Sequence, residues 1–309
     1  MGRGSVDAEL RFTSSEGRSR SVPVALERRI DPRTASQVPS ESSLIVVAPY
    51  LSKSVREVLE ARGASYADQT GNARVVIDEP GLFILTAGAE ANPWPDERKP
   101  SLRGIKAGRV VRALAVKRPP AGVRELAELA DTDPGYVSRL LEMLDSEAIV
   151  ERTSRGQVEQ VDWRRLLVQW SEDAPLEARA EATTWLAPRG LKTVLERLGA
   201  ADLRYLLTGS AAASRVAPIA PTRLLCVYVD DPGRAAEALG LRRTDAGANV
   251  ILLQPGDDAI YERGTEVEGL RQASLPMIAA DLLTGPGRSP AQAEALMDWM
   301  ETNEEAWRG

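Results

Sequence analysis

The stretch VRELAELADTDPGYVSRLLEMLDSEAIVERTSRGQVEQV, residues 123–161, carries the clearest fold signal in this chain. Its apolar stripe predicts a helix from Pro134 to about Ser146, with Asp133 as N-cap and proline at the first position. The stripe consists of Val137, Leu140, Leu141 and Leu144. Two short strands, 149–152 and 157–161, are then predicted on either side of a Ser154-Arg155-Gly156 turn.

Two further helices are predicted before this one. One helix is predicted over residues 106–117, because Val110, Val111 and Leu114 would lie on one side of it. Pro119-Pro120 ends this helix. Residues 123–130 form a short second helix, and Asp131-Thr132 turns the chain into the third. Three helices followed by a hairpin are typical of a winged helix-turn-helix, which we predict over residues 101–170. The turn departs from the common pattern, because Asp131 stands where glycine is usual.

The outward positions of the third helix suit a major groove, since they include an arginine fork, a hydroxyl and an aromatic ring. An arginine at the hairpin tip and basic residues on the first two helices are expected on the DNA backbone. The predicted DNA-binding residues are Arg103, Lys106, Arg109, Arg124, Gly135, Tyr136, Ser138, Arg139 and Arg155. Asp133 and Glu142 flank this face with negative charge, so a winged helix used only for protein contacts is the alternative.

Charge is distributed unevenly along the chain. Residues 101–165 hold twelve Lys or Arg against ten Asp or Glu, a net charge of +2, whereas the whole chain carries −6. The remaining residues therefore carry −8. A slightly basic segment inside an acidic chain permits a local phosphate-contacting face.

The residues before the helical segment predict a small α/β domain over 1–88. Strands are expected at 7–13, 20–26, 44–48, 66–68, 73–77 and 82–86, and a helix capped by Ser52 is expected to end near Arg62. Asp68 and Asp78 bracket a strand pair, as nuclease carboxylates can, but no Glu-x-Lys follows. Asp68 with Thr70-Gly71-Asn72 is better interpreted as a turn. Residues 89–100 contain three prolines and five charges, which predicts a linker.

Residues 171–309 predict a second α/β domain. Helices are expected at 188–198, 233–239, 275–283 and 290–300, and strands at 205–207, 224–229 and 250–253. Trp163 and Trp170 stand at helical spacing and are expected to pack the helical domain against its neighbour. Cys226 lies in an apolar strand, which predicts an inert core residue.

One constellation in this C-terminal part resembles a nucleotidyltransferase site. Thr208-Gly209-Ser210 follows a strand and opens a helix, where such enzymes hold triphosphate oxygens. Asp230-Asp231 ends the next strand, where they place carboxylates for magnesium. Adjacent carboxylates point to opposite sides of an extended strand, however, and the expected spacing is acidic-apolar-acidic. The domain is therefore interpreted as nucleotidyltransferase-like in a degenerate form at most, with Asp230 and Asp231 capping the next helix.

The composition excludes several function classes. The 309 residues are 43% hydrophobic and 27% charged, which is typical of a globular chain of two or three domains. The chain has no histidine and one cysteine, which excludes Ser-His-Asp catalysis, histidine-ligated metals and an intramolecular disulfide framework. Neither a membrane span nor a signal-peptide core is found. We expect a cytoplasmic protein with no cofactor, no metal and no catalytic residue.

Two segments carry a family resemblance. LIVVAPYLSKSVREVLEARGASYADQTGNARV, residues 44–75, followed by PGLFI at 80–84, resembles the N-terminal domain of AbiEi-type proteins. DLLTGPGRSPAQAEALMDWM, residues 281–300, is similar to the tail of the same family. These proteins are the antitoxin and transcriptional-regulator members of type IV, abortive-infection toxin–antitoxin systems. The central winged helix departs from the simplest antitoxin layout. The resemblance therefore implies DNA binding more strongly than it implies an antitoxin role.

The patterns together predict an α+β, multidomain regulator that binds double-stranded DNA in a sequence-specific way. The flanking α/β domains are expected to pair the protein with a second copy, as a homodimer, or to sense a cognate toxin or a small-molecule effector. Two alternatives remain open. One is a nucleotidyltransferase-like enzyme that uses Gly209-Ser210 and Asp230-Asp231, and the other is an antitoxin that acts by protein–protein contact alone.

Overall fold

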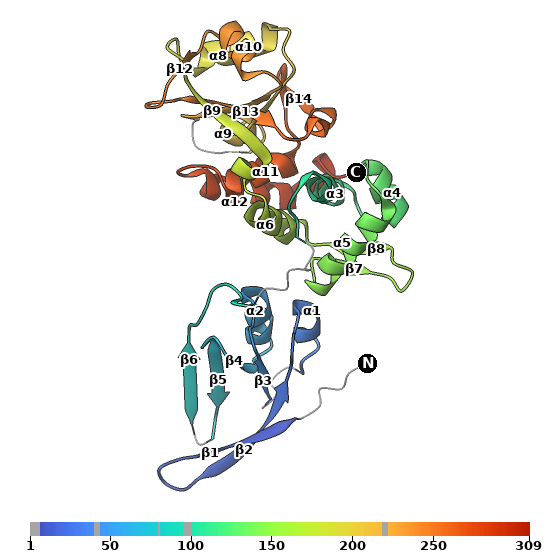
Figure 1. Cartoon of the computed structure of the whole chain (residues 1–309), viewed down its shortest axis with the longest axis vertical. Helices are drawn as coiled ribbons and strands as arrows, with labels where there is room; N and C mark the ends of the chain where they lie inside the picture. Colours follow the sequence, from blue (N-terminus) through green and yellow to red (C-terminus); the bar gives the residue numbers. More distant parts are fainter. Residues whose placement is uncertain (1–6, 40–43, 80, 95–100, 218–221) are drawn as a thin grey trace. The chain divides into compact units, whose positions relative to one another are not determined.

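The computed structural model describes residues 7–39, 44–79, 81–94, 101–217 and 222–309. The chain divides into two compact units, one of residues 1–99 with 142–148 and one of residues 100–141 with 149–309 (Figure 1). Both mix helices with sheets, as the α+β prediction requires. The predicted boundary at residue 170 lies inside the second unit. Residues 95–100 of the predicted linker lie outside the described residues.

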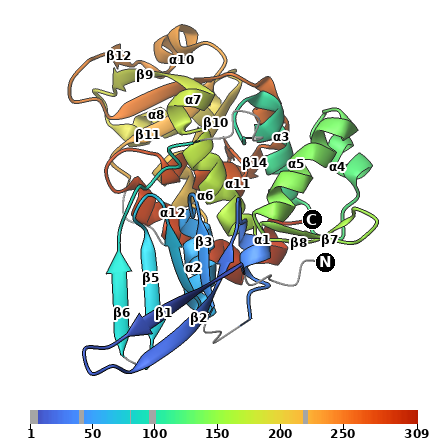
Figure 2. The same cartoon turned by 60° about the horizontal axis from the view of Figure 1, so that its bottom comes forward.

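The first unit is built on one six-stranded sheet with the strand order β1-β2-β3-β4-β5-β6. β2 pairs in parallel with β3, and β3 with β4, while the other neighbours are antiparallel. Figure 2 shows β1 and β2 as a long hairpin. The elements are β1 (Ala8–Thr13), β2 (Ser19–Leu26), α1 (Pro32–Ala35), β3 (Ile45–Ala48), α2 (Lys53–Ala61), β4 (Ser65–Asp68), β5 (Ala73–Ile77) and β6 (Leu82–Thr86).

The two helices of the first unit share a core with β3 and β4. Ser52 caps α2 as predicted, because its side chain accepts from the Val55 amide. Val55 and Leu59 on α2 are buried against strand residues such as Val46 and Tyr66. The short helix α1 was not predicted, although Asp31 caps it and proline stands in its first turn. The predicted strands of this unit are all confirmed to within two residues.

A dense hydrogen-bond network holds the turn between β4 and β5. Asp68 Oδ1 accepts from the Thr70 amide at 2.8 Å, the Thr70 hydroxyl at 2.6 Å and the Asn72 amide at 3.1 Å. Asp68 Oδ2 accepts from Asn72 Nδ2 at 2.9 Å and from the Leu51 amide at 3.1 Å. A Cβ at Gly88 would lie 2.3 Å from the Thr70 carbonyl oxygen, so only glycine fits beside the turn. The interpretation of Asp68 as a turn residue is confirmed.

Asp68→Ala should lower the free energy of unfolding of the first unit by about 2 kcal/mol, because it removes the acceptor of several part-buried donors at once. Urea unfolding, with amide hydrogen exchange of β3 and β4 as the local probe, measures this change. Asp78→Ala is the matched control, since Asp78 is exposed at the end of the next strand. Equal losses for the two variants would contradict the prediction.

The same network predicts a pH dependence. Burial raises the pKa of the Asp68 carboxyl, but hydrogen bonds from Thr70, Asn72 and Leu51 lower it by more, so the pKa lies below its usual value. A carboxyl with a lowered pKa in the folded state contributes stability above its unfolded pKa of about 3.9 and loses it as the pH falls through the folded pKa. The difference in free energy of unfolding between wild type and Asp68→Ala should therefore shrink as the pH falls below the unfolded pKa of about 3.9.

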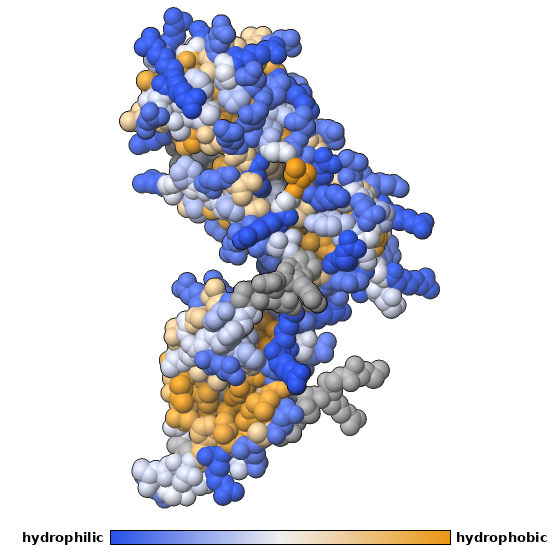
Figure 3. Space-filling view, in the orientation of Figure 1, coloured by the Kyte–Doolittle hydropathy of each residue, from blue (hydrophilic) through white to orange (hydrophobic). Residues whose placement is uncertain are grey.

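Apolar side chains are exposed on the last two strands of the first sheet. Phe83 is 65% exposed and Leu85 62% exposed on β6, which ends the strand order. Val76, which pairs with Phe83, is 39% exposed on β5. Figure 3 shows apolar side chains gathered over this part of the unit. This sheet edge therefore presents hydrophobic groups to solvent.

The second unit begins with a helical part. Its elements are α3 (Ile105–Val116), α4 (Val123–Leu129), α5 (Pro134–Ser146), β7 (Val150–Arg152), β8 (Val158–Val161), α6 (Trp163–Asp173) and α7 (Leu176–Arg179). Residues 142–146 at the end of α5 are grouped with the first unit. The helix and hairpin bounds agree with the predictions to within about one residue. Trp170 on α6 is 1% exposed and lies against Gly108 of α3. Trp163, also on α6, meets Trp307 edge to face, with ring centroids 5.2 Å apart.

The C-terminal part of this unit holds a seven-stranded sheet with the order β12-β9-β13-β11-β10-β15-β14. Its elements are β9 (Ala180–Leu186), α8 (Leu191–Ala200), β10 (Tyr205–Thr208), α9 (Gly209–Ala213), β11 (Leu225–Val229), α10 (Pro232–Leu239), β12 (Arg242–Arg243), β13 (Val250–Pro255), η1 (Asp258–Arg263), β14 (Thr265–Val267), β15 (Leu270–Gln272), α11 (Leu275–Leu283), α12 (Ser289–Thr302) and η2 (Glu304–Ala306). The predicted helices and strands are present, whereas β9, β12, β14 and β15 were missed.

An ion pair lies in the core where α7, α11 and the sheet meet. Arg179 Nη1 donates to Asp281 Oδ1 at 2.7 Å, and the two side chains are 9% and 2% exposed. Asp281 also accepts from the Thr208 and Tyr228 hydroxyls at 2.6 and 3.1 Å. Such a pair is held by the attraction between its charges and by these additional hydrogen bonds.

Cys226 lies on β11 and is buried, as predicted. Burial, with the nearby charge of Asp281, raises the pKa of its thiol to about 12. A thiol with such a pKa is protonated at neutral pH and is a poor nucleophile. Among the described residues, no helix is both long and apolar enough to cross a membrane.

Candidate nucleic-acid interface

α3, α4 and α5 form a three-helix group with a packed interior. Val137, Leu140, Leu141 and Leu144 of α5 are each at most 2% exposed, as their spacing predicted. Val110, Val111 and Leu114 of α3 are equally buried. The β7–β8 hairpin is attached to the group, because Ala121 and Val158 exchange backbone hydrogen bonds of 3.0 and 2.9 Å. The buried side of α5 therefore holds the helix in place, with its other side facing outward.

The turn between α4 and α5 has the conformation that glycine usually supplies. Asp131 has a φ of 45°, in the left-handed region that aspartate tolerates better than most residues. Its carboxylate accepts from Arg109 Nη1 at 2.6 Å. The departure from the common glycine is thus compatible with the usual backbone geometry, and it adds an ion pair to α3.

The predicted reading residues lie on the outward side of α5. Gly135 and Arg139 are exposed, while Tyr136 and Ser138 are half-buried. Asp133, whose charge could oppose DNA, is used as a cap, since its Oδ1 accepts from the Tyr136 amide at 3.0 Å. Burial raises the pKa of the Tyr136 hydroxyl, and the charge of Arg139 opposes this rise. The phenol is therefore neutral and able to donate a hydrogen bond at neutral pH.

The predicted backbone-contact residues lie at several places around this face. Arg155 is exposed in the turn of the β7–β8 hairpin, which Gly156 permits with a φ of 84°. Lys106 on α3 and Arg124 on α4 are also exposed. Arg103 precedes α3 and is exposed, but its Nε donates to the Asp173 carbonyl oxygen at 3.0 Å.

Arg109 differs from the other predicted contacts, because its guanidinium is engaged inside the protein. Its Nε lies 3.2 Å from each carboxylate oxygen of Asp257, and its Nη2 donates to Oδ1 at 2.8 Å. Arg112, one turn later on α3, donates from Nη2 to Asp257 Oδ2 at 2.6 Å. Arg109 therefore joins the helices to the C-terminal sheet, and we leave it out of the proposed DNA contacts.

Asp257 is the residue that sequence reasoning missed in this region. It stands between β13 and η1, and its Oδ1 also accepts from the Ala259 amide at 3.1 Å. Burial raises the pKa of its carboxyl, but the two arginines and the amide lower it by more, so Asp257 is ionised at neutral pH. No local pattern marks Asp257, because its two partners lie about 145 residues earlier in the chain.

The residues that resemble a nucleotidyltransferase site make local structural hydrogen bonds. Asp231 caps α10, where its Oδ1 accepts from the Gly233 and Arg234 amides at 2.8 and 3.0 Å. Asp230 Oδ1 accepts from the Asp231 amide at 2.9 Å. The Ser210 hydroxyl bonds to the Gln292 amide oxygen. Within the described ranges, no three Cys, Asp or Glu side chains are grouped to hold a metal ion.

Part of the chain matches the model of a known protein family. No match is found among curated proteins or among solved structures. The family match extends over residues 160–301 and contains the tail at 281–300. The resembling segment at 44–75 lies outside the match, so its resemblance stays a prediction. Over residues 160–301 the chain matches the model of the family described as "Transcriptional regulator, AbiEi antitoxin, Type IV TA system", which confirms the resemblance noted in its sequence.

Proposed function

We propose that this protein is a transcriptional regulator that binds double-stranded DNA sequence-specifically through a winged helix-turn-helix. In this proposal α3, α4 and α5 are the helices and the β7–β8 hairpin is the wing. The observation that carries it is the exposed guanidinium of Arg139 on the outward side of a helix whose other side is fully buried. A helix held in this way can enter a major groove.

Two groups of residues have different roles in this proposal. Gly135, Tyr136, Ser138 and Arg139 face the bases, where the arginine fork matches the guanine edge. Arg103, Lys106, Arg124 and Arg155 contact phosphates and set the position of the protein on the duplex. The net charge of +2 over residues 101–165, in a chain of −6, supports a local contact of this kind.

The family match supports a role as an antitoxin-type autoregulator. The matched range begins at the end of the β7–β8 hairpin and covers the C-terminal part of the second unit. We propose that this part binds a cognate toxin, and that a homodimer in the cytoplasm binds two related half-sites. Co-purification of the chain with the product of a neighbouring gene, followed by mass measurement of the complex, tests the toxin contact. A nucleotidyltransferase role would instead require Mg-NTP to raise the melting temperature.

DNA binding is tested first by its salt dependence on the gene's own upstream fragment. The logarithm of the association constant should fall linearly with the logarithm of the salt concentration, because counterions return to the phosphates. An affinity that does not change with salt, or that is equal for unrelated DNA of the same length, would contradict the proposal.

Arg155→Ala should weaken binding by about tenfold on all sequences and lower the salt slope by about one, since it removes one phosphate contact. Thermal stability should be unchanged because the side chain is exposed. Arg189→Ala, which removes an exposed arginine before α8, is the matched control. If the Arg155 variant loses affinity on only some sequences, the wing reads bases and its assigned role is wrong.

A further inference from the structure

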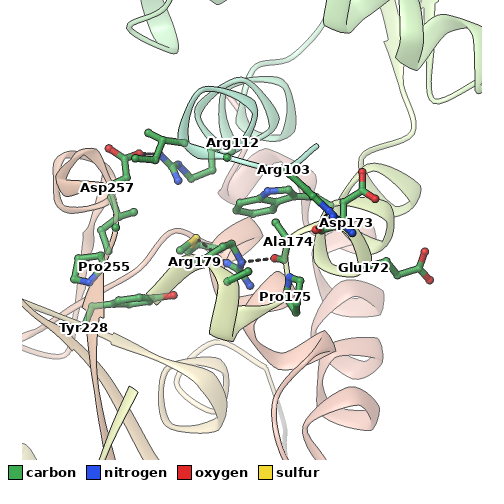
Figure 4. Close-up of a pocket in the computed structure, with 18 residues that line it drawn as sticks. Arg103, Arg112, Glu172, Asp173, Ala174, Pro175, Arg179, Tyr228, Pro255 and Asp257 are labelled. Atoms are coloured by element: carbon green, nitrogen blue, oxygen red, sulfur yellow. Dashed lines mark hydrogen bonds and ion pairs between the residues drawn. The ribbon is translucent and has the colours of Figure 1, made fainter. Parts of the chain in front are cut away.

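A cavity of about 550 Å³ lies between the helical part of the second unit and its C-terminal sheet. α3 contributes Ile105, Gly108 and Arg112 to its lining, and other elements contribute Trp170, Tyr228 and Met277. Figure 4 shows Arg112 and Tyr228 among the residues around the cavity. A Cβ at Gly108 would lie 3.2 Å from Trp170 Cζ2, so glycine leaves this wall open while the helices stay close. The volume and the mostly apolar walls match small-molecule sites, which often lie where two substructures meet.

One of the two buried arginines in this cavity, Arg179, already uses most of its donors within the protein. Arg179 lies with its guanidinium 4.6 Å from the centroid of the Trp170 ring. Its Nε donates to the Ala174 carbonyl oxygen at 2.8 Å, and its Nη groups donate to Asp281 and to the Ala280 carbonyl oxygen at 2.7 and 3.2 Å. Arg179 therefore forms part of the cavity floor and has few donors left for a ligand.

Arg112 is different, because most of its donors remain available. Its side chain is 8% exposed, and Asp257 is its one hydrogen-bond acceptor among the described residues. A guanidinium has five N–H groups, and Nη1 of Arg112 lies on the Gly108 side of the cavity, 3.7 Å from where a Cβ there would stand. The buried fork of Arg112 can thus accept a second partner without losing the first.

The charges around Arg112 favour an anionic partner. The Asp257 carboxylate is shared between Arg109 and Arg112, and the second partner of Arg109, Asp131, is exposed, so Asp257 is the one carboxylate bonded to Arg112 among the described residues. Burial and the charge of Arg112 together lower the pKa of Arg263, which also lies close by. Positive charge in a partly desolvated place is stabilised by an added carboxylate, and arginine binds carboxylates with two parallel hydrogen bonds.

We propose that this cavity binds a small, mostly apolar carboxylic acid, with the carboxylate on Arg112 and the apolar body against Trp170, Tyr228 and Met277. A ligand bound in the cavity would affect the proposed DNA-binding face through a short chain of ion pairs. Arg112 shares Asp257 with Arg109, and Arg109 holds Asp131 in the turn before α5. A bound carboxylate shares the charge of Arg112 with Asp257, which weakens the attraction between Arg112 and Asp257 without breaking their hydrogen bond and should weaken operator binding.

The binding test uses the full chain without DNA, so its result is independent of the proposed DNA-binding function. The probes are phenylacetate, 1-naphthoate and indole-3-acetate, each beside its uncharged amide, measured by thermal shift and calorimetry. The acids should raise the melting temperature and the amides should not. Arg112→Gln should weaken binding of the acids by about tenfold or more, because it removes the charged fork. If none of the three acids binds below about 10 mM, the proposal is overturned.

A second variant covers the case in which Arg112→Gln disturbs folding. Ile105 is 51% exposed at the cavity wall, so Ile105→Glu leaves the buried ion pairs intact. The added negative charge should weaken binding of the acids several-fold, whereas the neutral control Ile105→Gln should not. Equal affinities for Glu and Gln variants would place the acids elsewhere and overturn the site. An operator affinity that is unchanged at saturating acid would overturn the coupling to DNA.

Discussion

Arg139→Ala is expected to weaken operator binding by roughly ten- to a hundred-fold and to relax the sequence preference at one base pair. The side chain lies on the outward side of α5, opposite the buried Val137 and Leu140. In the proposed function, its loss removes one bidentate contact to a base edge, which is worth about 1–3 kcal/mol of discrimination. Competition binding against operator variants with single base changes measures both effects. Thermal stability should stay the same, because the removed group is exposed.

Arg242→Ala is the matched control, since Arg242 is an exposed arginine on β12 at the end of the C-terminal sheet. It removes the same charge from the chain without touching the helical part. If Arg139→Ala keeps both affinity and base preference, α5 is not the reading helix. If Arg242→Ala lowers affinity as much, the loss reflects total charge and the assignment to α5 is wrong.

Arg179→Met should lower the free energy of unfolding of the second unit by about 3–5 kcal/mol, because it leaves a buried carboxylate without its cation. Asp281 is 2% exposed in its side chain and would keep only the Thr208 and Tyr228 hydroxyls as donors. The stacking of the guanidinium on Trp170 would be lost as well. Chemical denaturation followed by circular dichroism gives the size of the loss.

Arg204→Met provides a close comparison for this variant. Arg204 also pairs with an aspartate and lies over an aromatic ring, but its side chain is 43% exposed and that of Asp258 72% exposed. Exposed pairs contribute at most about 1 kcal/mol, so this variant should change stability little. The double variant Arg179→Met/Asp281→Leu should recover part of the first loss, since no buried charge is then unpaired. Equal losses for Arg179→Met and Arg204→Met would contradict the role of burial.

The helices and strands that could be predicted from the sequence are those with a complete local signal. α5 has an apolar stripe, an N-cap and a proline at its first position, so its bounds were predicted to the residue. β9 has no such signal, because Ala180–Leu186 mixes small, polar and aromatic residues in a strand that is only partly buried. It becomes a strand through antiparallel pairing with β13, about 70 residues further along the chain. Tertiary pairing of this kind leaves no trace in local periodicity.

The residues of the candidate site also differ in whether the sequence predicts their positions. Helix periodicity predicts which side of α5 is outward, and Arg139 and Gly135 are exposed there. Periodicity does not predict what approaches the outward side of α3, where Asp257 engages Arg109 and Arg112. For that reason Arg109 was assigned to DNA on the basis of its charge and position alone. The cavity beside Arg112 depends on the same distant contact and had no signal in the sequence.

The left-handed turn at Asp131 has a consequence for how related sequences should vary. Glycine would adopt a φ of 45° without strain, but it would remove the acceptor for Arg109 Nη1. We therefore expect positions 109 and 131 to change together among relatives, with arginine retained where aspartate or asparagine stands in the turn. A search pattern that demands glycine at this position would pass over this chain, whereas one that scores the pair would find it.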